Sequence, residues 1–195
     1  MSNNYILGSH NSWSYLPPLH WWMWPFKFMA KCQSKTIKEQ YELGVRCFDL
    51  RVLFDKYGVV YVAHGFMKYD IDFSELNENL KWLNDKGDCY VRLIHEVRRK
   101  SQYTPNAVDY FRQFCEYVKT KYLCIYFWCG RNLYNWEFDY HFSPKPSCHE
   151  DYSSVSKPKL IDDWWPWLYS KLNNKKILAK GTDKEILLID FVNIK

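Results

Sequence analysis

Two histidines, one arginine and two aspartates fall at or near the ends of predicted strands. His10 follows YILGS, Asp49 and Arg51 lie in VRCFDLRVLF, His64 ends VVYVAH, and Asp190 ends EILLID. Two imidazoles and a guanidinium around one point suit phosphoryl transfer with an internal nucleophile. One histidine would remove a proton from a hydroxyl beside the phosphate, and the other would protonate the leaving oxygen. The arginine would hold the phosphoryl oxygens.

The chain must fold so that these residues meet. Asp49 and Arg51 are two apart on one strand and therefore project to the same side. In a closed barrel the last strand lies beside the first, so Asp190 would neighbour His10. A carboxylate there would hold the imidazole in one tautomer and stabilise its charged form.

Predicted strands and helices alternate along the chain, and most strands are continuously apolar, which indicates a parallel sheet covered by helices. Polar residues at the strand ends favour a closed barrel, because a barrel gathers those ends around one mouth. We therefore expect an α/β fold, a compact and distorted TIM-like (β/α) barrel, as a single domain over 1–195. Strands are predicted at 5–11, 45–54, 58–65, 89–97, 123–130 and 185–194. Helices are predicted at 34–44, 72–85, 105–122 and 158–174, with Ser34 as a cap and a short or irregular strand in 132–158.

Composition narrows the setting. The net charge is +5, which favours anionic partners, and 19% of the residues are aromatic. The seven cysteines include no C-x-x-C pair. Cys47, Cys89 and Cys124 lie in strand-like runs and are expected to be small buried residues, and a reduced environment is expected. The first predicted strand begins near Tyr5, so no signal peptide is expected. Cysteine usage then suggests cytoplasmic synthesis without classical export, although the localisation stays open.

Three motifs carry a resemblance to a known family. GSHNSW, CQSKTIKEQYELGVRCFDLRV and VAHGF follow one another in the order and spacing of the X-domain of phosphatidylinositol-specific phospholipase C. LLIDFVNI resembles that family's last barrel strand. The resemblance covers most of the chain and implies a distorted TIM barrel. It also implies attack of the inositol 2-hydroxyl on phosphorus, which releases diacylglycerol and leaves a cyclic inositol phosphate.

The resemblance assigns roles to the five residues above. His10 matches the general base, Asp190 the carboxylate that orients it, and His64 the general acid. Arg51 matches the arginine that replaces calcium in the bacterial, metal-independent branch, so no metal or other cofactor is expected. Asp49 matches the acidic residue two positions before that arginine.

Further positions follow from the same resemblance. Arg131 and Tyr152 match inositol-contacting residues, and either His95 or Glu96 takes the place of a bacterial lysine. Asn11 departs from the bacterial branch, which has an aspartate there that supports the general acid. An amide cannot stabilise an imidazolium as a carboxylate does. Asparagine at this position is typical of the calcium-dependent branch, so a calcium site at Asn11, Asp49 and Glu96 remains the alternative.

The segment LHWWMWPF falls where bacterial members have a membrane-inserting rim helix. Trp21, Trp22 and Trp24 are therefore expected to contact lipid, because tryptophan favours the membrane interface. The alternative is an aromatic segment that closes the barrel as a plug or packs on a neighbour. DDWWPWLY is expected to be core. The predicted partner is an anionic phospholipid at a membrane surface, bound peripherally, with no nucleic acid.

Two other functions stay open. Ribonuclease-type cleavage uses the same chemistry, but the chain has no basic aromatic track for RNA. A catalytically weak or inactive barrel could instead serve as a binding module in a larger assembly, which Asn11 favours and the His10, Arg51 and His64 set opposes.

Overall fold

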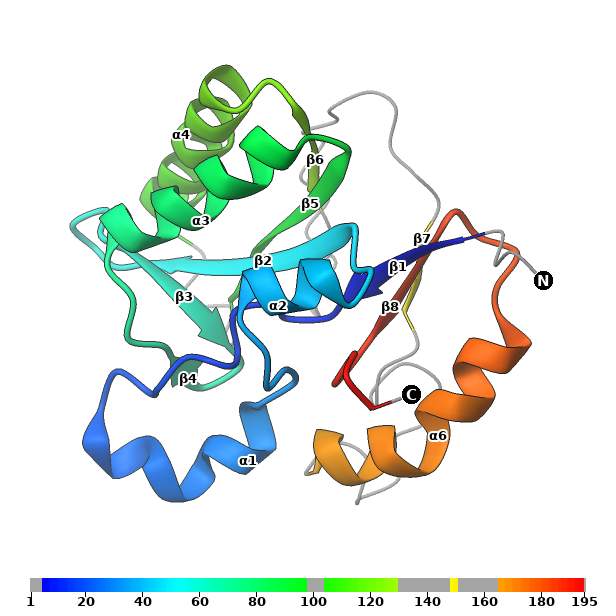
Figure 1. The fold of residues 1–195 in the computed structure, drawn as a ribbon. Coiled ribbons are helices and arrows are strands. Elements are labelled where there is room, and N and C mark those ends of the chain that lie inside the picture. Colours follow the sequence, from blue (N-terminus) through cyan, green and yellow to red (C-terminus); the bar gives the residue numbers. More distant parts are fainter. Residues whose placement is uncertain (1–4, 98–103, 130–147, 151–164, 195) are drawn as a thin grey trace.

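The computed structural model describes residues 5–97, 104–129, 148–150 and 165–194. Strands and helices alternate along much of it (Figure 1), but three consecutive strands lie between residues 47 and 68. The strands are β1 (Ile6–Ser9), β2 (Cys47–Phe54), β3 (Val60–His64), β4 (Met67–Lys68), β5 (Cys89–His95), β6 (Ile125–Cys129), β7 (Cys148–Glu150) and β8 (Ile186–Ile189). The helices are η1 (Trp21–Phe26, 3₁₀), α1 (Lys27–Ala30), α2 (Ile37–Glu42), α3 (Phe73–Lys86), α4 (Pro105–Lys121) and α6 (Pro166–Lys180).

The strands form one mixed, mainly parallel sheet. Parallel pairing links β6, β5, β2, β1, β8 and β7 in that spatial order. The last predicted strand does return beside the first, with Ser9 paired to Ile189. Within the described ranges, however, β6 and β7 do not pair, so the sheet is not closed. The mixed α/β class is therefore confirmed, and the closed TIM-like barrel stays a prediction.

The expectation of a parallel third strand was wrong. β3 pairs antiparallel with β2, with Val52 opposite Val62 and Phe54 opposite Val60. The connection between them is too short for a parallel crossover, which needs a dozen or more residues. The Asp55 carboxylate accepts hydrogen bonds from the N–H groups of Tyr57 and Val59 and so stabilises a tight turn.

Two strands, β1 and β3, pair with different parts of the same edge of β2. β5 pairs with β2 from Cys47 to Val52 and occupies one edge. β1 pairs with the beginning of the other edge, at Cys47 and Phe48, and β3 with its end, from Val52 to Phe54. Since β1 is parallel and β3 antiparallel to β2, the carboxyl ends of β1 and β3 point toward each other.

One face of this sheet changes from apolar to polar along the strands. A small apolar cluster contains Cys47, Ile186 and Leu188, which precede the charged residues Asp49 and Asp190 along the chain, together with Trp128 of β6. Gly8 passes close to this cluster, since a Cβ there would lie 2.4 Å from Leu188 Cδ2. Toward the carboxyl ends, charged side chains take over the same strands. The apolar cluster therefore forms the floor of a polar site.

The larger hydrophobic core is formed together with the helices. Leu76, Leu80 and Leu83 of α3 form its buried stripe, as the sequence predicts. α2 begins with a capping box between Thr36 and Glu39, so the predicted cap at Ser34 was wrong by two residues. Thr36 is capable of this because its Oγ1 accepts the Glu39 N–H while the Glu39 carboxylate accepts the Thr36 N–H. Nowhere in the described part of the chain is a helix long and apolar enough to cross a bilayer.

Candidate active site

The site lies at the carboxyl ends of β1, β8, β5 and β3 and along the middle of β2. His10 directly follows β1, Asp190 follows β8, Glu96 follows β5, and His64 ends β3. Asp49 and Arg51 project from β2 between them, since both contact residues of this group. The structure thus brings together the residues at the predicted strand ends, as far as it describes them.

His10 and Asp190 form the innermost pair. His10 Nδ1 lies 2.7 Å from Asp190 Oδ1, and both side chains are buried. The backbone that carries them is also held: the Gln33 side-chain amide donates to the carbonyls of His10 and Ile189, and Asn174 donates to the carbonyl of Asp190. The pair is therefore fixed by side chains from other parts of the chain.

Burial controls the charge of this pair. Desolvation, followed by Arg51, His64 and Arg92, lowers the pKa of His10 well below its usual value. Desolvation raises the pKa of Asp190 to about 8. A proton shared between two hydrogen-bonded groups belongs to the pair rather than to either residue. The pair therefore holds one proton below about pH 8.

His64 faces His10 from the opposite direction. The two ring centroids are 5.3 Å apart and the rings are nearly perpendicular. The outer nitrogen of His64, Nδ1, lies 3.0 Å from the Ala30 carbonyl, which fixes the ring. Burial and then Arg51 lower the pKa of His64, while Glu96 and the Ala30 carbonyl raise it. Two imidazoles this close can both reach the oxygens of one phosphate group.

Asp49 is the hub of a charged network. Its Oδ2 accepts a hydrogen bond from Arg51 Nε at 2.8 Å and from the Asn11 backbone N–H at 3.0 Å. Arg92 NH1 lies 3.7 Å from its other oxygen, Oδ1. Although burial alone would raise the pKa of Asp49, Arg51 and Arg92 lower it below its usual value. Asp49 is thus ionised and holds Arg51 against the histidine pair.

Glu96 and His95 point to different sides of the sheet. Glu96 Oε2 lies 3.4 Å from Arg51 NH1, and its other oxygen accepts the Gly65 N–H at 2.8 Å. His95 instead stacks on Phe111 in the hydrophobic core, with ring centroids 5.1 Å apart. Desolvation lowers the pKa of His95 to about 4, so the ring is neutral. Of the two candidates for the bacterial lysine position, only Glu96 faces the site.

Asn11 occupies a strained backbone position. Its φ is +43°, in the left-handed region that asparagine tolerates better than most residues. The residue is completely buried, and the following Ser12 exchanges hydrogen bonds with the backbone of Asp49. This turn aims the Asn11 N–H at the Asp49 carboxylate. Arg131 and Tyr152, the predicted inositol-contacting residues, lie outside the described residues.

The aromatic segment is a rim helix with its rings outward. Trp21, Trp22 and Trp24 are 83%, 54% and 55% exposed, and only Met23 of η1 is buried, at 5%. These three rings are therefore not a plug buried within the described part of the chain. α1 lies beside the start of α6 (Figure 1), where the Phe28 and Trp165 rings are 6.2 Å apart.

The expectation that DDWWPWLY is core was wrong for Trp165 and Trp167, which are 45% and 40% exposed. In the same stretch Pro166 is buried and Tyr169 packs against the core. The two exposed tryptophans extend the aromatic surface that η1 and α1 begin.

Sequence reasoning missed three polar residues. Arg92 interrupts the apolar run of β5, and its register position opposite Asp49 makes it a neighbour of the site. Gln33 links the ends of β1 and β8. Cys32 Sγ lies 3.8 Å from His64 Nδ1. A charge inside an apolar strand was a usable signal for Arg92, whereas Cys32 and Gln33 lie in a connection whose path only the fold reveals.

Comparison with protein-family models and with curated proteins finds no match. Solved structures do match. A phosphatidylinositol-specific phospholipase C from Listeria monocytogenes superposes with a TM-score of 0.60 at 15% identity, over 95% of this chain and 87% of that one. A variant of the Staphylococcus aureus enzyme gives 0.64 at 17% identity, over 97% and 85%. Another structure of the staphylococcal enzyme, from work on the modulation of its membrane binding, gives 0.58 at 17%, over 97% and 86%. The chain therefore has the fold of bacterial phosphatidylinositol-specific phospholipases C.

Proposed function

We propose that this protein is a phosphodiesterase of the phospholipase C type that cleaves phosphatidylinositol lipids. The observation that carries the proposal is the pair of facing imidazoles, 5.3 Å apart, with Arg51 acting on both. The shared fold supports the same conclusion. An acid, a base and a fixed cation around one point are what in-line cleavage of a phosphodiester requires.

In this proposal each group has one task. His10, held by Asp190, accepts the proton of the inositol 2-hydroxyl as its oxygen attacks phosphorus. Arg51 donates hydrogen bonds to the phosphoryl oxygens as negative charge develops on them. His64 gives a proton to the departing diacylglycerol oxygen. The products are diacylglycerol, which carries the proton from His64, and a cyclic inositol phosphate; His10 ends with the proton of the 2-hydroxyl.

The proposed reaction needs no metal. Arg51 places a fixed positive charge beside Asp49, and Asp49 Oδ2 already accepts hydrogen bonds from Arg51 and from the Asn11 backbone. Glu96 is engaged by Arg51 and by the Gly65 N–H. The carboxylates that calcium would need are thus paired with other donors, which disfavours the alternative calcium site.

The substrate would be met at a membrane surface. The exposed rings of Trp21, Trp22 and Trp24 lie on the rim segment, and Lys27 Nζ lies 5.3 Å from the Trp24 ring centroid. Exposed tryptophans beside lysines suit the interface of an anionic bilayer, where an apolar body and a polar N–H are both accommodated. Contact with the membrane would be peripheral.

We also propose that the strands close into a compact barrel, as the sequence predicts.

One assay tests the function. Purified protein is added to vesicles that contain phosphatidylinositol, and diacylglycerol and cyclic inositol phosphate are measured with and without a chelator. We expect both products, and we expect their loss in His10→Ala. Vesicle binding without either product would favour the binding-module alternative. Cleavage of RNA to cyclic phosphates, with no lipid cleavage, would favour the ribonuclease alternative.

A further inference from the structure

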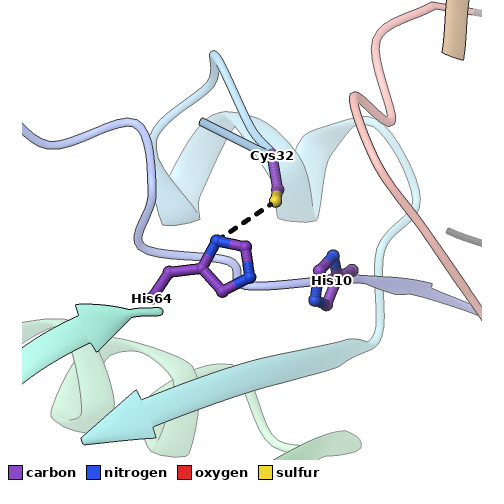
Figure 2. A group of neighbouring side chains, drawn as sticks. All are labelled: His10, Cys32 and His64. Carbon is purple, nitrogen blue, oxygen red and sulfur yellow. Dashed lines mark hydrogen bonds between the residues drawn. The ribbon is translucent and has the colours of Figure 1, made fainter. Parts of the chain in front are cut away.

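We propose that Cys32, His10 and His64 form a site for a thiophilic divalent cation such as Zn²⁺. One donor atom from each residue, the Cys32 sulfur and a nitrogen of each imidazole, can be chosen so that all lie within 4.8 Å of one another. Figure 2 shows the three side chains converging from the end of β1, the end of β3 and the segment after α1. Two histidines and a cysteine form a ligand set that zinc prefers.

The spacing is close to what the ion requires. Zn–N and Zn–S bonds of about 2.1 and 2.3 Å place neighbouring donors in a tetrahedral site about 3.5 Å apart. Cys32 Sγ and His64 Nδ1 are already 3.8 Å apart. The widest separation would have to contract by about 1 Å, which small side-chain rotations supply. His64 is only partly buried, so the site has a route from solvent.

His10 also has an outer hydrogen-bond partner. His10 Nδ1 contacts the Asp190 carboxylate at 2.7 Å, which leaves Nε2 for the ion, whereas His64 Nδ1 would exchange its contact with the Ala30 carbonyl for the bond to zinc. Metal-bound histidines commonly donate one ring N–H to a carboxylate or to a backbone carbonyl, which fixes the ring and strengthens the ligand. The structure therefore supplies the outer support of a metal site as well as its ligands.

The surrounding charges also permit a cation. Asp49, Asp190 and Glu96 are carboxyl groups within the network, and Arg51 and Arg92 are its cations. On binding, the Cys32 thiol would lose its proton to solvent and add a negative charge beside the ion. Arg51 is occupied by Asp49 at 2.8 Å, so its charge is partly offset before any ion arrives. Calcium, which prefers oxygen ligands, would gain little from two nitrogens and a sulfur.

Such a site would inhibit the enzyme. This consequence rests on the proposed function, because zinc would occupy both imidazoles that the reaction uses. Three protein ligands would leave the fourth position to water. We expect Zn²⁺ to compete with the phosphodiester, and we expect a chelator to restore the rate. Binding itself does not depend on the function and can be measured without a substrate.

The decisive measurement is zinc affinity of the reduced protein, by competition with a chromophoric chelator. We expect one tight site, with affinity lowered at least about tenfold in Cys32→Ser and in His64→Gln. Co²⁺ in place of zinc should give a sulfur-to-metal absorption band in the wild type that is lost in Cys32→Ser. Thermal unfolding of each variant without metal shows whether it is folded, and Cys32→Ala provides a second test if Cys32→Ser is not.

Two cysteine variants serve as controls. Cys124→Ser changes an exposed thiol, so the expectation that Cys124 is buried was wrong. Cys129→Ser changes a buried thiol whose Sγ lies 3.8 Å from that of Cys115. Both should keep the wild-type affinity. Equal affinity in Cys32→Ser and wild type, or loss of the cobalt band only in Cys129→Ser, would overturn the site. Tight binding lost in Cys32→Ser, in a protein that never cleaves phosphatidylinositol, would preserve the site and reject the proposed function.

Discussion

His10 and His64 face each other because the carboxyl ends of β1 and β3 point toward each other along one edge of β2. β1 runs parallel to β2 and ends at Ser9, opposite Phe48, while β3 runs antiparallel and reaches Val62, opposite Val52. The residues that follow these positions close on each other until their ring centroids are 5.3 Å apart. Asp49 and Arg51 lie in the stretch of β2 between the two strand ends. The change of strand direction thus produces the facing pair on which the proposed reaction depends.

Removing the base, His10, and removing the acid, His64, should affect different steps of the reaction. His10→Ala and His64→Ala should each lower the rate on phosphatidylinositol by about 10²- to 10⁴-fold, the usual contribution of general acid–base catalysis. With a soluble inositol phosphodiester whose leaving group is a weakly basic phenol, His64→Ala should recover most of its rate, because such a group departs without a proton. His10→Ala should not recover.

The matched control for these variants is His20→Ala, which removes an exposed histidine that stacks on Trp22. Its rate on the soluble substrate should equal that of the wild type. Equal recovery of His10→Ala and His64→Ala would contradict the assignment of base and acid.

Activity should depend on pH through the His10–Asp190 pair. The reaction needs one proton in all on His64 and the His10–Asp190 pair, because His64 must give a proton and the pair must accept one. Burial raises the pKa of Asp190 to about 8 and lowers the pKa of His64, so this one-proton state lies between the two pKa values. We expect kcat/KM to follow a bell with an alkaline limb near pH 8 and an acid limb below pH 6.5. Asp190→Asn should lower the rate and move the alkaline limb. A limb that stays near pH 8 in Asp190→Asn would assign it to another group.

The same pair should govern stability at alkaline pH. The raised pKa of Asp190 means that the folded state binds a proton more tightly than the unfolded chain between pH 4 and about 8. Stability from this group is therefore present at acid pH and is lost as the pH rises toward 8. Melting temperatures at pH 6 and pH 9 should differ less in Asp190→Asn than in the wild type. A larger difference in the variant would contradict the buried, neutral state.

Arg51 should matter through its shape as well as its charge. Its Nε contacts Asp49 and its NH1 contacts Glu96, an arrangement of donors that lysine cannot reproduce. Arg51→Lys should reduce kcat by about 10²- to 10³-fold, as loss of a transition-state donor does. In the wild type, chelation of calcium should leave the rate unchanged. Loss of activity in a calcium-selective chelator, with recovery on added calcium, would instead support a site at Asn11, Asp49 and Glu96.

The rim segment offers a matched pair of neighbouring residues. Trp22→Ala, at a ring that is 54% exposed, should weaken vesicle binding and lipid cleavage while sparing turnover of a soluble substrate. Each tryptophan that enters the interface contributes up to about 1.5–3 kcal/mol. Met23→Ala, at a side chain that is 5% exposed, should instead lower the free energy of unfolding by about 2–5 kcal/mol. The melting temperature should fall accordingly. Unchanged vesicle affinity in Trp21, Trp22 and Trp24 variants would reject the membrane contact.

Gly8 should be required for the floor of the site. A Cβ there would lie 2.4 Å from Leu188 Cδ2 and 3.1 Å from Cys47 Cβ. Gly8→Ala should therefore destabilise the fold by about 1–3 kcal/mol, the usual cost of overpacking. The double variant Gly8→Ala with Leu188→Ala should recover part of the overpacking loss, measured as a double-mutant cycle by denaturant unfolding. Simple additivity of the two losses would show that the contact is not the cause.

The sequence by itself determined the α/β class, the polar ends of the strands, the helices α2, α3, α4 and α6, and most of the strands, but not η1, α1 or β4. These depend on local properties: apolar runs, helix caps and the spacing of side chains along one strand. Asp49 and Arg51 share a face because of the strand period, and β8 lies beside β1 as predicted. The pattern of residues also marked His10, His64 and Asp190 as one group before any distance was known.

Only the tertiary structure decided how these residues meet. The direction of β3 depends on the tight turn at Asp55, and it brings His64 to His10 head-on rather than side by side. The choice of Glu96 over His95 depends on which face of β5 is covered by α4 and its Phe111. Cys32 and Gln33 reach the site through a connection whose path is set by packing and by hydrogen bonds to Ser14, Ile189 and Phe191. Such long-range contacts leave no periodic signal in the chain, because each is formed by residues far apart in sequence.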